Sequence, residues 1–223
     1  MSQKQTAKFI YHLTMKRSKK AIVAEYGPAF WEKFQKGSDE RFSGLIREFP
    51  DIGKSMFAFN YAYAPGYVAW YKTMEELSLS AEQRDLLMLL MNEKMLLTVP
   101  KGLLHLVGKA YLSNMRKGSA LHVKRQQEGK LHDLDWKVYY RDVDKEHFEI
   151  DILECGFIKY ARHYQAEGML PGICQVDYMI SHYMNVGFER TKTLGAGGCC
   201  CDGKYAMCGS CKWDPKVCLQ ERR

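Results

Sequence analysis

The stretch WKVYYRDVDKEHFEIDI, residues 136–152, decides the fold of the carboxyl-terminal half. Apolar side chains occupy every second position in two runs: Trp136, Val138 and Tyr140, then Phe148, Ile150 and Ile152. A period of two is typical of strands with one buried face. Asp144 and Lys145 lie between the runs, so the sequence predicts a β-hairpin.

The residues after this hairpin are expected to complete the sheet by way of two helices. Helical spacing returns at 157–167 and stops at Gly168, a residue type common just past a helix end. Pro171 and Gly172 precede a second predicted helix at about 173–184. Two further strands are expected at 186–193 and 199–206, joined by the glycine-rich turn at 195–198. The order β-β-α-α-β-β predicts an antiparallel-sheet unit of the α+β class.

The amino-terminal half is predicted to be helical and to pack on this unit. Gly27 and Pro28 end the first helix, and Ser80 with Gln83 forms a capping box that opens another. Helices are expected at 5–26, 39–48, 53–63, 65–77, 80–97 and 101–116, and an exposed connection at 117–133. The chain is therefore divided into a helical region at 1–130, a motif-bearing α+β region at 131–206 that shares the same core, and a cysteine-rich tail at 207–223.

Composition indicates a globular protein with a basic surface. Hydrophobic residues make up 46% and charged residues 26%, and 33 Lys and Arg against 26 Asp and Glu give a net charge of +7. Since no uncharged run approaches the roughly 20 residues of a membrane helix, no membrane partner is expected. No nucleic-acid motif is found, so a nucleic-acid partner is not expected either, although the basic amino half leaves open docking to an acidic protein or a nucleic acid.

The amino terminus lacks the apolar stretch of a secretory signal, so we expect a cytoplasmic protein whose eight cysteines are reduced thiols. The sequence leaves the oligomeric state open, a homo-oligomer included.

Cys174 and Asp177 form the first candidate pair. Three residues apart on a helix, they share a face, and Cys174 is expected in the first helical turn. There the helix dipole can lower the pKa of a thiol and provide a nucleophilic thiolate. Asp177 could then accept or deliver a proton. The plain alternative is a small buried residue beside a surface acid.

Arg190 is expected to point toward the interior, because it shares strand parity with Val186 and Phe188. A buried guanidinium needs an anion. Its partner is either Asp177 or the carboxylate of a bound substrate, and the sequence does not choose between them.

The remaining cysteines raise the question of a metal. Cys199, Cys200 and Cys201 are consecutive and precede Asp202, with Cys199 and Cys201 expected on one strand face. A C-x2-C-x6-C pattern follows; its members are Cys208, Cys211 and Cys218. One CxxC pair with a further cysteine is compatible with structural zinc, whereas two pairs would be the usual zinc pattern. No other cofactor is expected.

Three segments together resemble the L-2-amino-thiazoline-4-carboxylic acid hydrolase family. They are CGFIKY from residue 155, LPGICQVDY at 170–178 and RTKTLGAGGCCCD at 190–202. The family pattern falls on Cys155, Cys174, Asp177, Arg190, Thr193, Gly197, Cys201 and Asp202. Gly203 stands where the family usually has an aromatic residue, and Cys199 and Cys200 replace residues that are commonly acidic or aromatic.

The resemblance implies hydrolytic opening of a small, anionic, carboxylated heterocycle at its C2 carbon. In one version the Cys174 thiolate adds to C2 and Asp177 moves the proton; in the other, Asp177 activates water directly. Cys201 joins these two as a catalytic candidate. The candidates for holding the substrate are Arg190, Cys155, Thr193 and Asp202. The rival interpretation is a non-catalytic small-molecule- or metal-binding module similar to 4-vinyl-reductase-type domains.

Overall fold

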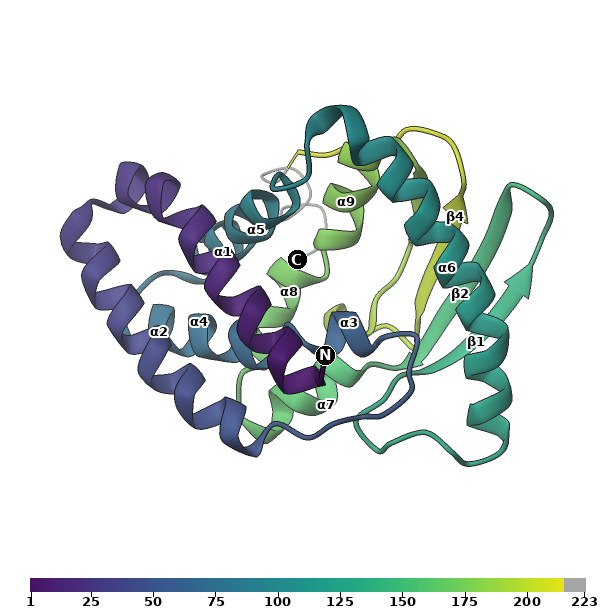
Figure 1. Ribbon diagram of the computed structural model, residues 1–223, viewed down its shortest axis with the longest axis horizontal. Helices are drawn as coiled ribbons and strands as arrows, with labels where there is room; N and C mark the ends of the chain where they lie inside the picture. The colour runs from purple at the N-terminus through teal and green to yellow at the C-terminus, as the bar shows by residue number, and fades with distance from the viewer. Residues whose placement is uncertain (215–223) are drawn as a thin grey trace.

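The computed structural model describes residues 1–214 and confirms the α+β class (Figure 1). A four-stranded antiparallel sheet lies at one side of the molecule, and helices of the amino-terminal half form the other side. The helices before the sheet are α1 (Gln3–Tyr26), α2 (Pro28–Glu48), α3 (Ala58–Tyr61), α4 (Ala64–Glu76), α5 (Ala81–Leu96) and α6 (Lys101–Gln127). Within residues 1–214, no helix is long and apolar enough to cross a membrane.

The sheet begins with the predicted hairpin, β1 (Lys137–Asp142) and β2 (His147–Glu154). Its buried positions are those expected from the alternation, with Val138, Phe148 and Ile150 all inaccessible to solvent. The last strand, β4 (Cys201–Ala206), pairs with β2, and the short β3 (Gly187–Glu189) pairs with β4. The order is therefore β1-β2-β4-β3, which brings the final segment of the motif region to the centre of the sheet.

Between β2 and β3 lie α7 (Gly156–His163), the 3-10 turn η1 (Glu167–Met169), α8 (Leu170–Ile173) and α9 (Val176–Met184). A second 3-10 turn, η2 (Leu194–Ala196), forms the glycine-rich connection to β4, and Gly197 there has a φ of 82°. The buried cluster runs without a break from Ala7 in α1 to Val186 before β3, so the helices and the sheet are held by one core.

Several predicted boundaries were wrong. The expected exposed connection at 117–133 is helical as far as Gln127, because α6 continues along the edge of the sheet. There the Gln126 side chain both accepts from Val138 N and donates to Val138 O. Helix α2 begins at Pro28, well before the start of the predicted helix at 39–48. Of the predicted helix at 53–63, only Ala58–Tyr61 forms.

The carboxyl-terminal elements are also shorter than predicted. The helix expected at 157–167 ends at His163, and Gln165 follows with a φ of 52°. The strands expected at 186–193 and 199–206 reduce to Gly187–Glu189 and Cys201–Ala206. The predicted helix at 173–184 is two helices, α8 and α9, which are separated at Cys174 and Gln175.

Candidate functional site

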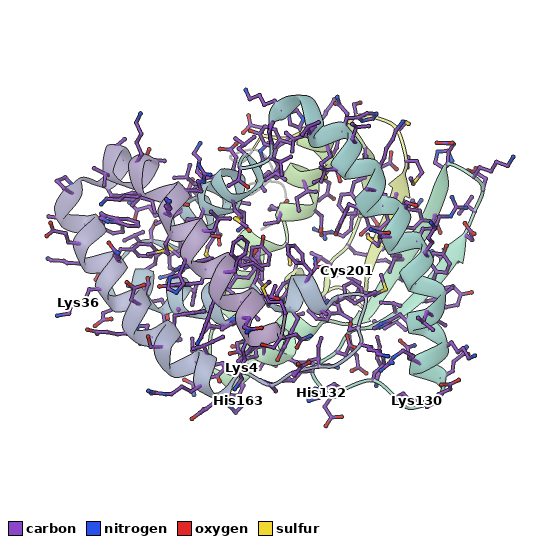
Figure 2. All side chains as sticks on the ribbon, in the orientation of Figure 1. Lys4, Lys36, Lys130, His132, His163 and Cys201 are labelled. Atoms are coloured by element: carbon purple, nitrogen blue, oxygen red, sulfur yellow. The ribbon has the colours of Figure 1, made fainter. Side chains whose placement is uncertain are left out.

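Four segments of the motif region meet between the sheet and the helices. They are the start of α7, the α8–α9 junction, the loop from Arg190 to Gly198, and the first residues of β4. Figure 2 shows the buried Cys201, at the start of β4, where the sheet meets the helical half. Hydrogen bonds join Cys174, Asp177, Arg190, Thr193 and Cys201 into one connected group. Residues that lie far apart in the sequence are thus brought together.

The expected activation of Cys174 by a helix start is wrong. Cys174 follows the last residue of α8 and precedes α9, and its N–H donates to the carbonyl of Leu170. It lies one residue before Gln175, the N-cap of α9, and is therefore outside the first turn of that helix, and the donor to its sulfur is the Thr193 hydroxyl. Burial raises the pKa of the Cys174 thiol to about 11, although the nearby Arg190 guanidinium acts in the opposite direction. In the free protein this thiol is therefore protonated at neutral pH.

Arg190 and Asp177 form the ion pair that the sequence offered as one of two alternatives. Arg190 Nη1 donates to Asp177 Oδ2 at 2.9 Å, and Arg190 Nη2 donates to the carbonyl oxygen of Cys174 at 2.5 Å. The Arg190 side chain is only 5% exposed, whereas that of Asp177 is 43% exposed. The guanidinium also lies near the rings of Tyr178 and Phe188, with centroid distances of 5.4 and 5.6 Å. The ion pair thus holds a partly solvent-accessible carboxylate against a buried guanidinium.

Thr193 connects two of the thiols. Its hydroxyl lies 3.8 Å from Cys174 Sγ and 3.3 Å from Cys201 Sγ, while Leu194 N donates to Cys201 Sγ at 3.2 Å. Gly195 permits this close packing, because a Cβ at that position would lie 3.0 Å from Cys174 Sγ. The η2 turn thus holds both sulfur atoms at fixed positions.

Asp202 orders the loop that carries Thr193. Its Oδ1 accepts from the backbone N–H groups of Thr191 and Lys192 at 3.0 and 2.8 Å, and its Oδ2 accepts from the Thr191 hydroxyl at 2.5 Å. Burial acts to raise the pKa of Asp202, but these hydrogen bonds outweigh it and lower the pKa below its usual value. The observed contacts of Asp202 are therefore with its own loop, and its role as a substrate ligand stays a prediction.

Cys155 completes the group from the start of α7. Burial raises the pKa of its thiol to about 12, and charge on Cys174 or Cys201 acts in the same direction. Cys199 does not join them: it is exposed, because β4 begins only at Cys201 and the expected shared strand face with Cys201 does not form.

Sequence reasoning missed two tyrosines beside Asp177. Tyr111 of α6 and Tyr205 of β4 line a small hollow with Asp177; Leu112, Ile180, Ser181 and Val186 complete the lining. Its volume is about 10 Å³, room for about one water molecule. Burial raises the pKa of Tyr111 to about 12, with the Asp177 charge acting in the same direction. A lone tyrosine has no motif, so the place of Tyr111 is revealed only by the packing of α6 on α9, and that of Tyr205 only by the position of β4 in the sheet.

A thiazoline ring does not fit within this hollow alone. Cys155, Cys174 and Asp177 nevertheless each keep accessible surface although they lie deep between the elements. Among their side chains, that of Asp177 is 43% exposed and is the part of the group that a ligand can contact.

The tail cysteines are placed only in part. Cys208 is exposed, and Cys211 is buried against Tyr178 and Phe188. Cys218 lies outside the described residues. Among residues 1–214, no group of three or more metal-ligating side chains is close enough to hold an ion. Zinc bound by the tail cysteines therefore stays a prediction.

The sequence profile of the L-2-amino-thiazoline-4-carboxylic acid hydrolase family matches residues 56–205. The chain belongs to this family. The match covers every residue of the clustered site, from Cys155 to Asp202, and leaves α1, α2 and the tail cysteines outside. A comparison with curated proteins finds no match. The family is named for a hydrolase activity.

Proposed function

We propose that the chain is a hydrolase that opens a small carboxylated heterocycle of the 2-amino-thiazoline-4-carboxylate type. The observation that carries the proposal is the Arg190–Asp177 ion pair at 2.9 Å, with the carboxylate partly exposed beside a hollow the size of one water molecule. An oriented carboxylate next to a water site is the arrangement that general-base hydrolysis needs. Membership of the hydrolase family supports the same conclusion.

In this proposal the reaction begins at C2 of the thiazoline ring, which is bonded to nitrogen and sulfur. The Asp177 carboxylate accepts one proton from water as the water oxygen bonds to C2, and the electron pair of the C2–N double bond moves to the ring nitrogen, which takes this proton from Asp177. The tetrahedral carbon then carries a hydroxyl group. Asp177 accepts the hydroxyl proton as the C=O bond forms and the bond to the ring sulfur or the ring nitrogen breaks, and it passes this proton to the departing atom. The product is an open-chain carbamoyl derivative, and the carboxylate ends the cycle unprotonated.

Arg190 has two roles in this account. It holds Asp177 in place, since the guanidinium is nearly inaccessible and donates to both Asp177 and the Cys174 carbonyl. A guanidinium has five N–H donors, so donors remain for the carboxylate of a substrate that reaches the site. Thr193 and Cys155 are proposed to line the space in which the ring binds, and Asp202 to order the loop that carries Thr193.

The raised pKa of Cys174 favours direct attack by water over a covalent intermediate. A thiol with a pKa of about 11 is protonated at pH 7, whereas covalent catalysis requires the thiolate. Cys174 and Cys201 are then wall residues whose sulfur atoms are fixed by Thr193. The covalent version would require the bound substrate itself to lower the pKa of Cys174.

The experiment is a rate measurement with L-2-amino-thiazoline-4-carboxylate and its analogue that lacks the carboxylate. We expect turnover of the first and loss of at least about tenfold in kcat/KM for the second, because the remaining N–H donors of Arg190 then have no substrate carboxylate to bind. A thiol reagent distinguishes the bond: C–S cleavage releases a free thiol, and C–N cleavage releases a free amine. Saturable binding of the carboxylated ring with no turnover would overturn the hydrolase in favour of a binding module.

A further inference from the structure

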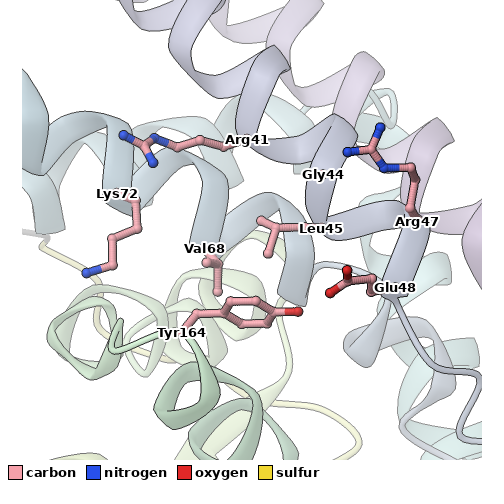
Figure 3. A pocket seen from close by; sticks show the side chains of 8 residues that line it. All are labelled: Arg41, Gly44, Leu45, Arg47, Glu48, Val68, Lys72 and Tyr164. Atoms are coloured by element: carbon pink, nitrogen blue, oxygen red, sulfur yellow. The ribbon is translucent and has the colours of Figure 1, made fainter.

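A second hollow, separate from the thiol group, lies on the helical half (Figure 3). Its volume is about 420 Å³, within the range of small-molecule sites. The lining comes from α2, α4 and the residue after α7; its members are Arg41, Gly44, Leu45, Arg47, Glu48, Val68, Lys72 and Tyr164. None of them belongs to the candidate functional site. The two sites lie at opposite ends of α7, which starts after Cys155 and ends before Tyr164, about 12 Å apart for a helix of eight residues.

The hollow combines an apolar floor with positive charge at its edge. Leu45, Val68 and the ring of Tyr164 lie at its centre, and Figure 3 shows Arg41 and Lys72 together at one end. Arg47 and Glu48 lie at the other end, toward which the Tyr164 hydroxyl points. Three cations and one carboxylate line the hollow, and two further carboxylates, Glu75 and Glu76, are paired with Lys72 and Arg41 at its edge. The excess of cations in the lining favours an anion that competes with these carboxylates, and the floor favours a ligand with an apolar body.

Arg41 and Lys72 retain hydrogen-bond donors for such a ligand. Arg41 donates one N–H to Glu76 at 2.6 Å, and Lys72 donates one to Glu75 at 3.0 Å. A guanidinium offers five donors and an ammonium three. The Arg41–Glu76 pair is also exposed, and exposed pairs are held weakly. An incoming carboxylate can therefore be bound from both cations without removing a buried partner.

We propose that this hollow binds a small organic carboxylate with an aromatic or branched aliphatic body. The carboxylate lies between Arg41 and Lys72, and the apolar body covers Leu45, Val68 and the Tyr164 ring. The positive charge accounts for recognition of an anion. The apolar floor accounts for the preference of the hollow for an organic carboxylate over an inorganic anion. The site includes α2, which lies outside the family match, so it joins the extra amino-terminal helices to the hydrolase region.

The test is calorimetric titration of the full chain with 4-phenylbutyrate, its neutral amide and sulfate. We expect saturable one-to-one binding of phenylbutyrate with Kd below about 1 mM, and binding of the amide and of sulfate at least about tenfold weaker. No saturable binding of phenylbutyrate, or equal binding of the amide or of sulfate, would overturn the proposal.

Two independent variants locate the binding. Lys72→Met keeps the aliphatic chain and removes the charge. Gly44→Leu fills the hollow, and it is tolerated because a Cβ at Gly44 meets nothing within 4 Å and leucine favours a helix. Lys36→Met is the matched control: Lys36 is exposed on α2, is not part of the lining of the hollow, and lies at the edge of the molecule (Figure 2).

We expect at least about tenfold weaker binding in Lys72→Met and in Gly44→Leu, and unchanged binding in Lys36→Met. Circular dichroism shows which variants are folded, and a loss in either folded variant with the control unchanged supports the site. Wild-type affinity in both variants would place the ligand elsewhere and overturn the proposal. Because the readout is binding, the result does not depend on whether the chain hydrolyses a heterocycle.

Discussion

Arg190 and Asp177 are unequal partners: the guanidinium is 5% exposed and the carboxylate 43% exposed, yet they are joined at 2.9 Å. This difference in exposure determines how much stability is lost when either side chain is truncated. Loss of the carboxylate leaves a buried charge with one fewer anion, whereas loss of the guanidinium leaves a carboxylate that water can solvate.

We therefore predict that Asp177→Ala destabilises the protein more than Arg190→Met does. Asp177→Ala is expected to lower the free energy of unfolding by about 3 kcal/mol, and Arg190→Met by about half of that. Urea denaturation of the two variants measures the difference. Equal losses, or a larger loss for Arg190→Met, would show that the pair is not held by the buried cation.

Thiol reactivity checks the raised pKa of Cys174. With a pKa of about 11, only ~10⁻³ of this thiol is ionised at pH 8, and the fraction rises about tenfold with each pH unit up to pH 10. We expect iodoacetamide to modify the exposed Cys199 and Cys208 first and Cys174 slowly, with a rate that increases with pH in this way. Peptide mass spectrometry follows each site. Rapid modification of Cys174 at pH 7 would restore the covalent mechanism.

Asp202 is expected to make the free energy of unfolding depend on pH in the acidic range. Its pKa is lower in the folded protein than in the unfolded chain, so its contribution is complete above the unfolded pKa near 4 and is lost as the pH falls through the folded value. We predict that Asp202→Ala costs about 1–3 kcal/mol at pH 7, and that the difference from wild type shrinks below about pH 4. Denaturation at pH 7 and pH 3 measures both. A difference that stays constant would exclude this role.

Gly195 is expected to be sensitive to a single methyl group. In Gly195→Ala the new Cβ lies 3.0 Å from Cys174 Sγ, so the thiol or the η2 turn must shift. We predict a loss of about 1–2 kcal/mol in the free energy of unfolding and reduced turnover. Gly44→Ala is the matched control, since its Cβ meets nothing and helical Gly→Ala changes stabilise by about 0.5–1 kcal/mol. Similar effects of the two changes would contradict the close packing around Cys174.

Sequence patterns were enough to predict the elements that are held by contacts between residues close together in the chain. The Ser80 and Gln83 capping box is present, with both of its hydrogen bonds, and the alternation from Trp136 to Ile152 marks the hairpin correctly. The end of α6 could not be found in this way. Its last turns are mostly polar, yet Ser119 and His122 are buried there. They are fixed by hydrogen bonds from His122 to the Trp136 carbonyl and from Gln126 to the edge of β1, contacts that no periodicity records.

The sequence was enough to predict which residues form the site, but not how they are arranged. The family motif named Cys174, Asp177, Arg190 and Cys201, and these do meet. The predicted environment of Cys174 was wrong because α9 begins only at Val176, so Cys174 lies between two helices and not in a first turn, and burial raises the pKa of its thiol. Tyr111 lies far from the motif in sequence, so its place beside Asp177 depends on the packing of α6 against α9.

The most direct test of the central claim is the kcat of Asp177→Asn and Cys174→Ser with L-2-amino-thiazoline-4-carboxylate, each compared with wild type after its folding has been checked. The account predicts that Asp177→Asn loses about 10²–10⁴-fold, as expected for loss of a general base, and that Cys174→Ser stays within about tenfold of wild type. Wild-type turnover in Asp177→Asn would contradict the account.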